Sequence, residues 1–299
     1  MKLTATNAST DQGLQVLNHL LVPDAPALPG ILGFTDSAGR FGASPVSIRI
    51  LTEPCVVVWF NHGDPVEAVG NGGQRRLGSH VRGIQSRVVD LKPGRHLGSN
   101  AVKLAPQAFE QVFGVPAAEV TDRLVPLADL VGATEVAAIE DQLRALDAAT
   151  RRTALVETFL VRQSRRARRL RDDRAVSRSL DVVLAGTGPS TVEGLSDAIG
   201  LGRRQLERRF AARTGLTPKS YLRIARIRDA LRAWHAGQPW AEVALEAGYA
   251  DQSHFVRDFK SFIGMAPASF ARNSASPTFR QINDGLGESA FVNCLVVPA

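Results

Sequence analysis

The stretch EVALEAGYADQSHFVRDFK, residues 242–260, decides the fold of the C-terminal third of this chain. Its first part has apolar residues at helical spacing and ends at Gly248, a residue suited to a left-handed helix stop. Asp251 then offers a side-chain oxygen that can cap a second helix. Phe255 and Phe259 lie four residues apart, so they place one apolar stripe on that second helix. Helix, glycine turn and helix over about 20 residues predict a helix-turn-helix unit.

The same pattern occurs once more, earlier in the chain. A shift of 49 residues, the separation of Leu206 and Phe255, superposes six positions of the two copies. The superposed pairs are Leu206 and Phe255, Arg208 and Arg257, Phe210 and Phe259, Gly215 and Gly264, Pro218 and Pro267, and Tyr221 and Phe270. Each copy therefore predicts a short helix that ends at a glycine, followed by a proline that opens the next helix.

The earlier copy also has an upstream helix of its own. Thr191 is a candidate N-cap for this helix, and Gly200 is expected to end it. Gly202 is expected to cap the helix that follows, more weakly than an aspartate would. Between the two units, apolar residues in 221–231 recur at helical spacing and predict one longer joining helix.

Residues 195–270 closely resemble the DNA-binding domain of the AraC/XylS family of transcription regulators. The segments that carry the likeness are 242–260 and Gly264-Met-Ala-Pro267 in the second unit, and 201–210 and 214–218 in the first. The resemblance extends over roughly residues 174–273 and implies a seven-helix, all-α domain in which a long helix joins two reading helices. Gly202 departs from the family, which commonly has Ser there, so the first reading helix is expected to be capped more loosely.

In such a domain, the outward positions near the start of each reading helix reach base edges in the major groove. The candidate DNA-binding residues are Arg203, Arg204, Gln205, Glu207 and Arg208 in the first unit, and Gln252, Ser253, His254 and Arg257 in the second. Arg208 and Arg257 are the strongest candidates, because the guanidinium fork suits guanine. A solvated helix face accounts for the same residues without DNA. Arg209 and Asp258 lie off this face, where packing and phosphate contact are both open.

The N-terminal half has a different pattern. Residues 31–104 contain alternating apolar residues and short apolar runs such as 56–60, which predict a β-sandwich or barrel. Helices are expected at 107–113, 135–146 and 150–170. Segments 102–106, 113–117 and 122–130 are similar to the N-terminal region of one AraC/XylS subgroup, which implies a cupin-like sensor or dimerisation domain.

The predicted chain is thus an α+β protein with three parts. They are a sensor domain at 1–170, β-rich and then helical, an all-α DNA-binding domain with two helix-turn-helix units at 171–273, and a C-terminal extension at 274–299. The apolar end of that extension, residues 291–297, suits either a strand added to the sensor domain or local packing.

Catalysis and metal binding find no positive support. His62, His80 and His96 lie near predicted strands, but no second histidine at close spacing and no glutamate complete a cupin metal set. We therefore expect structural or surface histidines and no cofactor. Cys55 and Cys294 are far apart in the sequence, so no disulfide framework is expected, and we predict two plain buried residues. The pattern also gives no support for a nucleophilic cysteine or for the cysteine-rich domain of an alkyl-transfer repair protein. The chain is not expected to be an enzyme.

Two features of the sensor domain leave alternatives open. Side chains that suit a small apolar pocket, or equally a packed core, are Phe34, Phe41, Trp59 and Phe60, with Arg49 as a polar anchor. Helical stripes that favour a dimer interface, or equally one monomer's core, contain Val136, Ile139, Leu143 and Leu146, and Leu155, Phe159 and Leu160.

Composition narrows the class of protein. With 299 residues, 44% hydrophobic and 22% charged, the chain is expected to fold, and its net charge of +7 is compatible with a polyanionic partner. Arginines crowd the stretch 162–178, which suits either phosphate contacts or a solvated face. The longest apolar run, residues 55–60, is far short of the roughly 20 residues that span a bilayer, and the N-terminus lacks a signal peptide's apolar stretch. A cytoplasmic protein with no membrane partner is predicted.

The sequence therefore predicts a sequence-specific DNA-binding transcription regulator with two reading helices in successive major grooves. Its expected partners are double-stranded DNA, RNA polymerase, a small-molecule effector or partner at the N-terminal domain, and a second copy of the chain. The alternative is a small-molecule-binding or catalytic β-domain for which the helical domain only supplies recruitment to DNA.

Overall fold

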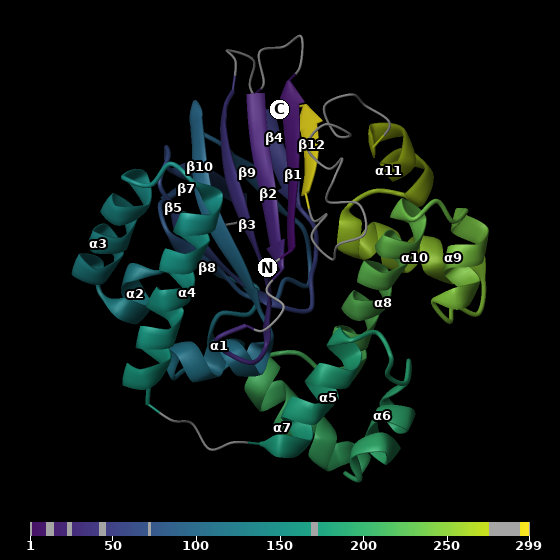
Figure 1. Ribbon diagram of the computed structural model, residues 1–299. Helices are drawn as coiled ribbons and strands as arrows, with labels where there is room; N and C mark the ends of the chain where they lie inside the picture. Colours follow the sequence, from purple (N-terminus) through teal and green to yellow (C-terminus); the bar gives the residue numbers. More distant parts are fainter. Residues whose placement is uncertain are drawn as a thin grey trace.

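The computed structural model describes residues 2–9, 15–22, 26–41, 46–70, 73–168, 173–274 and 294–298. A β-rich part with its own covering helices is formed mainly by the N-terminal half, and a helical part follows it in the chain and lies beside it (Figure 1). Within these residues, all strand pairs are antiparallel. The predicted α+β architecture, with antiparallel sheets in the N-terminal part and a helical C-terminal domain, is confirmed. We keep the name sensor domain for the β-rich part with its covering helices.

Two sheets form the β-rich part. The seven-stranded sheet has the order β1 (Lys2–Ser9), β2 (Gln15–Val22), β3 (Ile31–Arg40), β10 (His96–Leu104), β5 (Val56–Asn61), β8 (His80–Arg82) and β11 (Leu124–Pro126). The five-stranded sheet has the order β12 (Cys294–Pro298), β4 (Val46–Ile50), β9 (Val89–Lys92), β6 (Val66–Gly70) and β7 (Gly73–Leu77). Strand β5, which lies between β10 and β8, is buried along almost its whole length, as its run of apolar residues predicts.

The strands β1, β2 and β11 were not predicted, whereas a strand near the end of the chain was one of two arrangements considered. β1 and β2 pair over their full lengths, from Lys2 with Val22 to Ser9 with Gln15, and β2 continues onto β3. Their sequences mix polar and apolar residues, so the pairing partner rather than local alternation defines them. The last strand, β12, pairs with β4 and thereby joins the sensor domain, which is the first of the two arrangements considered for the extension.

The sensor helices are α1 (Pro106–Phe113), the 3-10 turn η1 (Ala117–Glu119), α2 (Ala128–Val131), α3 (Ala133–Arg144) and α4 (Ala149–Arg166). Phe60 of the sheet meets Phe159 of α4 edge to face, with ring centroids 5.4 Å apart, which fixes α4 against the sheet. Val136, Ile139, Leu143, Phe159 and Leu160 are all buried in the core of a single chain. One monomer's core thus covers most of the two stripes, and a dimer through them stays a prediction.

Seven helices form the described residues 174–274. They are α5 (Arg174–Leu184), α6 (Val192–Ile199), α7 (Arg203–Thr214), α8 (Pro218–His235), α9 (Trp240–Glu246), α10 (Gln252–Ile263) and α11 (Pro267–Ser274). Leu206 and Phe210 in the first unit, and Phe255 and Phe259 in the second, are fully buried. The predicted apolar stripes therefore form the core that holds each unit against the joining helix α8.

The capping residues behave as their types predict. The Thr191 hydroxyl accepts a hydrogen bond from the amide of Gly194, and the Asp251 carboxylate accepts one from the amide of His254 at 2.7 Å. Gly202 precedes α7 in an extended conformation and has no side chain to offer. The two reading helices thus begin differently although they end alike, at Gly215 and Gly264 in left-handed conformations.

The arginine-rich stretch does not form one continuous face. α4 ends at Arg166 and α5 begins at Arg174, with residues 169–172 outside the described part. Arg162 and Arg166 both pair with Glu135 of α3, at 2.6 and 2.9 Å. These two arginines therefore tie α3 to α4.

Candidate nucleic-acid interface

The first reading helix, α7, carries its predicted contact residues on a solvent-facing side. Arg204, Gln205 and Arg208 are exposed, whereas Leu206 points into the core. Within the described residues, Arg204 and Arg208 make no ion pair. Their guanidinium groups keep all their donors available for an acceptor from outside the chain.

Arg203 differs from these two arginines. It pairs with Glu193 of α6 at 2.6 Å and with Glu207 one turn along α7 at 3.0 Å. The hydrogen bond to Glu207, together with the negative charge of Glu193, raises the pKa of Arg203, and the two carboxylates hold its side chain across the turn between the helices. Arg203 and Glu207 thus link the two helices of the first unit.

The second reading helix, α10, has a similar face with different chemistry. Gln252, Ser253 and Arg257 are exposed, and Arg257 makes no ion pair within the described residues. His254 is half-buried, because its ring stands edge-on to Tyr249 in the turn, with centroids 5.3 Å apart. His254 therefore contacts the turn and keeps part of its side chain exposed.

Two arginine–carboxylate clamps hold the reading helices, and sequence reasoning missed both. Arg209 binds Asp173, the N-cap of α5, through two nitrogens. Asp258 of α10 is buried and binds two nitrogens of Arg223 on α8, at 2.6 and 3.1 Å. Because each pair joins residues at least 35 positions apart, no local pattern could reveal it. Arg209 and Asp258 have packing roles here.

The charges of both clamps are held by their partners. The Arg209 guanidinium, with the amide of Val176, lowers the pKa of Asp173 in spite of partial burial. Burial opposes ionisation of Asp258, but Arg223 outweighs it and lowers the pKa of this carboxyl. Both carboxylates are thus charged at neutral pH, as a bidentate arginine contact requires.

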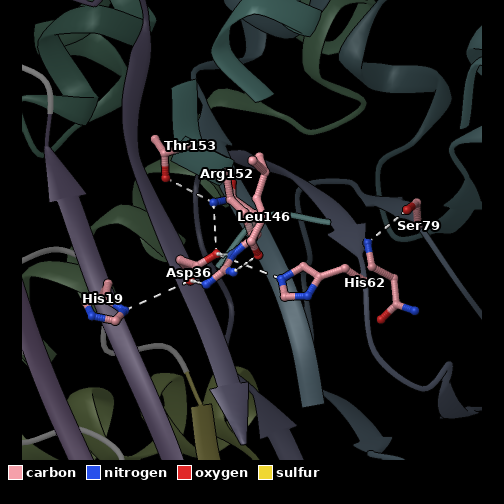
Figure 2. Close-up of polar contacts among 9 residues, drawn as sticks. His19, Asp36, His62, Ser79, Leu146, Arg152 and Thr153 are labelled. Carbon is pink, nitrogen blue, oxygen red and sulfur yellow. Dashed lines mark hydrogen bonds and ion pairs between the residues drawn. The ribbon is translucent and has the colours of Figure 1, made fainter. Parts of the chain in front are cut away.

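The sensor domain holds a buried polar cluster around Asp36 of β3. Arg152 of α4 donates to both Asp36 oxygens, at 2.7 and 2.6 Å, and Asn100 donates to Thr153 at 3.0 Å. Figure 2 shows His19 and His62 on opposite sides of Asp36, with ring nitrogens 4.0 and 3.9 Å from its oxygens. Burial alone would raise the pKa of Asp36, but Arg152, His62 and Asn100 lower it to about 2.

The other predicted histidines lie apart from this cluster. His80 is buried, stacks on Trp59, and has its pKa lowered to about 4 by burial, so it is neutral at pH 7. His96 is exposed beside Asp64. No group of three or more metal-binding side chains occurs among the residues that the structure describes.

The residues considered for an apolar pocket belong mainly to packed regions. Phe34 and Phe60 are fully buried core residues, and Arg49 makes two hydrogen bonds to Asp90. Cys55 is a buried free thiol whose pKa is raised by burial to about 12, which keeps it protonated. The side chain of Cys294 lies outside the described residues.

Comparisons with known proteins agree with this geometry. Residues 195–273 match a family model described as a helix-turn-helix domain, and residues 35–126 match a domain of unknown function (DUF6597). The regulatory protein Ada of Salmonella typhimurium is 29% identical over 129 residues, which are 41% of this chain and 36% of that protein. The HTH-type transcriptional activator RhaS of Pectobacterium atrosepticum is 31% identical over 84 residues, 28% of this chain and 30% of that protein. The alignments thus span about a third of the length of these relatives.

Among solved structures, ToxT from Vibrio cholerae superposes with a TM-score of 0.46 at 13% identity, covering 79% of this chain and 97% of that one. The C-terminal domain of AraT, a response regulator from Geobacillus stearothermophilus, gives a TM-score of 0.32 at 23% identity, covering 34% of this chain and 88% of that one. None of the described helices is both long enough and apolar enough to cross a membrane.

Proposed function

We propose that this chain is a member of the AraC/XylS family, which its C-terminal helix-turn-helix domain resembles, and that it regulates transcription by binding specific DNA sequences. The observation that carries the proposal is the pair of repeat-related helices α7 and α10. Each buries two large apolar side chains against the domain core, and exposed arginines point outward, Arg204 and Arg208 on α7 and Arg257 on α10. Arg204, Arg208 and Arg257 form no ion pair within the described residues, so DNA is the partner that suits them.

In this proposal, Arg208 and Arg257 each offer a bidentate fork to a guanine, and Gln205, Ser253 and His254 meet neighbouring base edges. Arg203 and Glu207 hold the first unit together, so their part in reading is indirect. The joining helix α8 would place the two helices in successive major grooves about 10 base pairs apart. One monomer would then read two short blocks of sequence.

Selection of binding sites from a random DNA library tests the proposal, with wild type, Arg208→Ala and Arg257→Ala run in parallel. Loss of a bidentate arginine–guanine contact costs about 1–3 kcal/mol and relaxes preference at one base pair. Each variant should therefore lose preference in a different block. Arg151→Ala is the matched control, because Arg151 is an exposed arginine on α4 of the sensor domain. If both variants lose affinity uniformly for all sequences, these arginines contact only phosphates and the reading face is wrongly assigned.

The sensor domain would supply control, through a small-molecule effector or a protein partner, and RNA polymerase and a second copy of the chain are further proposed partners. Its α4 is tied to the sheet by the buried Asp36–Arg152 pair, so a change on the sheet reaches α4 directly. We also propose that the chain is not an enzyme. The protonated, buried Cys55 supports this, because alkyl transfer needs an accessible thiolate.

A further inference from the structure

The two reading helices end at repeat-related glycines, and both glycines lie against the sensor domain. A Cβ placed on Gly215 would lie 3.0 Å from Cβ of Thr121 and 3.2 Å from Cα of Ala118. A Cβ placed on Gly264 would lie 3.2 Å from a guanidinium nitrogen of Arg49 and 3.4 Å from a methyl group of Val88. The ends of the two helices therefore touch two different places on the same domain.

Polar contacts strengthen the first of these places. The Thr121 hydroxyl donates to the carbonyl of Thr214, the last residue of α7, at 2.7 Å. One residue earlier on α7, Arg213 forms an ion pair with Glu110 of α1, which is only 5% exposed. Thus α7 is held by a hydrogen bond and an ion pair from the sensor domain, in addition to its clamp to Asp173.

The second place is built on the five-stranded sheet. Arg49 of β4 is oriented by its two hydrogen bonds to Asp90 of β9, at 2.8 and 2.9 Å, and so presents a fixed surface to Gly264. The helix α11, which follows Gly264, contacts β12 at the edge of the same sheet. In Figure 1, α7 lies near α1, whereas α11 lies beside β12.

A third contact lies between the two. The Tyr221 hydroxyl, on the joining helix α8, donates to the carbonyl of Pro54 in the segment before β5. Tyr221 is fully buried, so this hydrogen bond forms away from water. The helical domain is therefore attached to the sensor domain near the end of each reading helix and on the helix between them.

We propose that the sensor domain positions both reading helices through these contacts, with Thr121 and Arg49 as positioning residues for α7 and α10. The separation of the two DNA blocks that the protein prefers is then set by the sensor domain together with α8. A rearrangement of the sensor domain would change block separation while leaving the base preference within each block intact. The DNA part of this inference rests on the proposed function, whereas the positioning part does not.

The experiment compares full-length wild type with Thr121→Val, Arg49→Gln and the double variant. Thr121→Val keeps the shape of the side chain and removes the hydroxyl donor. Thr158→Val is the matched control, because the Thr158 hydroxyl also donates to a backbone carbonyl, that of Ala154 at 2.8 Å, on α4. Thr121→Ser retains the donor and should restore wild-type behaviour, which separates positioning from a general loss of folding.

Two measurements decide the outcome. Pulsed electron-spin distance measurements between labels at the exposed residues Ala212 and Ser261 report the separation of α7 and α10 without DNA. We expect the distance distribution to broaden or shift in Thr121→Val, Arg49→Gln and the double variant. In the control Thr158→Val it should match that of wild type. An unchanged distribution in all three would overturn the proposal.

The second measurement is binding to DNA in which the two selected blocks are separated by spacers of different length. For each variant we compare the affinity for DNA with the preferred spacer to the affinity for DNA whose spacer is one base pair longer. In Thr121→Val this ratio should fall by up to about 5-fold, which corresponds to the loss of one neutral hydrogen bond. A ratio that stays at the wild-type value, with only overall affinity lowered, also overturns the inference. If wild type shows no base preference in any block, the proposed function fails, and the spin-label distances still test the positioning.

Discussion

Gly200 and Gly202, which flank the turn of the first helix-turn-helix unit, should respond in opposite ways to the same substitution. A Cβ added at either position meets no atom within 4 Å, so space does not distinguish them. The backbone does: Gly200 has φ 67°, in the left-handed region, whereas Gly202 has φ −63° and ψ 143°, which any residue adopts. Replacement of each by Ser therefore isolates the backbone and the cap.

Gly202→Ser should stabilise the start of α7. The substitution reduces the conformational freedom of the unfolded chain, which raises the free energy of unfolding by about 0.4–1 kcal/mol. A capping hydroxyl adds a few tenths of a kcal/mol to this gain. Gly200→Ser forces a side chain into the left-handed conformation and should cost about 1–2 kcal/mol. The two variants have the same composition, so their difference comes from position alone.

Amide hydrogen exchange of Leu206 measures the effect locally, because its N–H donates to the carbonyl of Gly202 in the first turn of α7. A gain of about 1 kcal/mol slows exchange about 5-fold, and a loss of about 1–2 kcal/mol speeds it about 5- to 30-fold. Equal exchange rates in the two variants, or faster exchange in Gly202→Ser than in wild type, would refute the reasoning from φ and capping.

Three further predictions concern other parts of the chain. The folded-state pKa of Asp36 is about 2, below its usual 3.8, so ionised Asp36 stabilises the fold fully above about pH 4, and this stabilisation is lost as the pH falls towards 2. In urea unfolding, Asp36→Asn should remove this pH dependence. At pH 7 it should lower the free energy of unfolding by about 3–5 kcal/mol, because Arg152 stays buried without its carboxylate. Phe259→Ala should destabilise the fully buried core of the second unit by about 3–5 kcal/mol in the same assay, and a cost below about 1 kcal/mol would contradict the packing described. In a fluorescence titration, affinity for DNA should fall steeply between about 50 and 200 mM salt, because arginines displace counterions from phosphates. An affinity that does not change with salt would exclude phosphate contacts as a main contribution.

The sequence predicted the helical domain well because its signals are local. The caps at Thr191 and Asp251 and the stops at Gly200 and Gly264 act within a few residues, and the structure confirms all four. Helix ends in the sensor domain were less accurate: the helix predicted to reach residue 170 ends at Arg166, where no glycine or proline marks the end. The nine candidate DNA-binding residues stay a proposal.

Features that depend on distant partners could not be predicted. Strand β2 is defined by its pairing with β1 and β3. For residues 291–297 the sequence left a strand and local packing open, and pairing with the distant strand β4 decides for the strand. The pair Asp36 and Arg152 joins residues 116 positions apart, and neither residue stands in a pattern that indicates a charge buried under a helix. The sequence left two roles open for Arg209, packing and phosphate contact. Its ion pair with Asp173 shows a packing role, but capping rules identify Asp173 only as the start of a helix.

The pairing of β12 with β4 makes the helical domain an insertion within the sensor domain. Both ends of residues 174–274 lead back to one body, so two covalent tethers, rather than one linker, keep the domains together. A doubly tethered domain has a high effective concentration at its docking surface, so individually weak contacts suffice to seat it. Release from those contacts leaves both ends of the domain attached to the sensor domain, so the released domain stays near its docking surface. A signal in the sensor domain could therefore change the pose of the reading helices quickly and reversibly, without the cost of reuniting two separated parts.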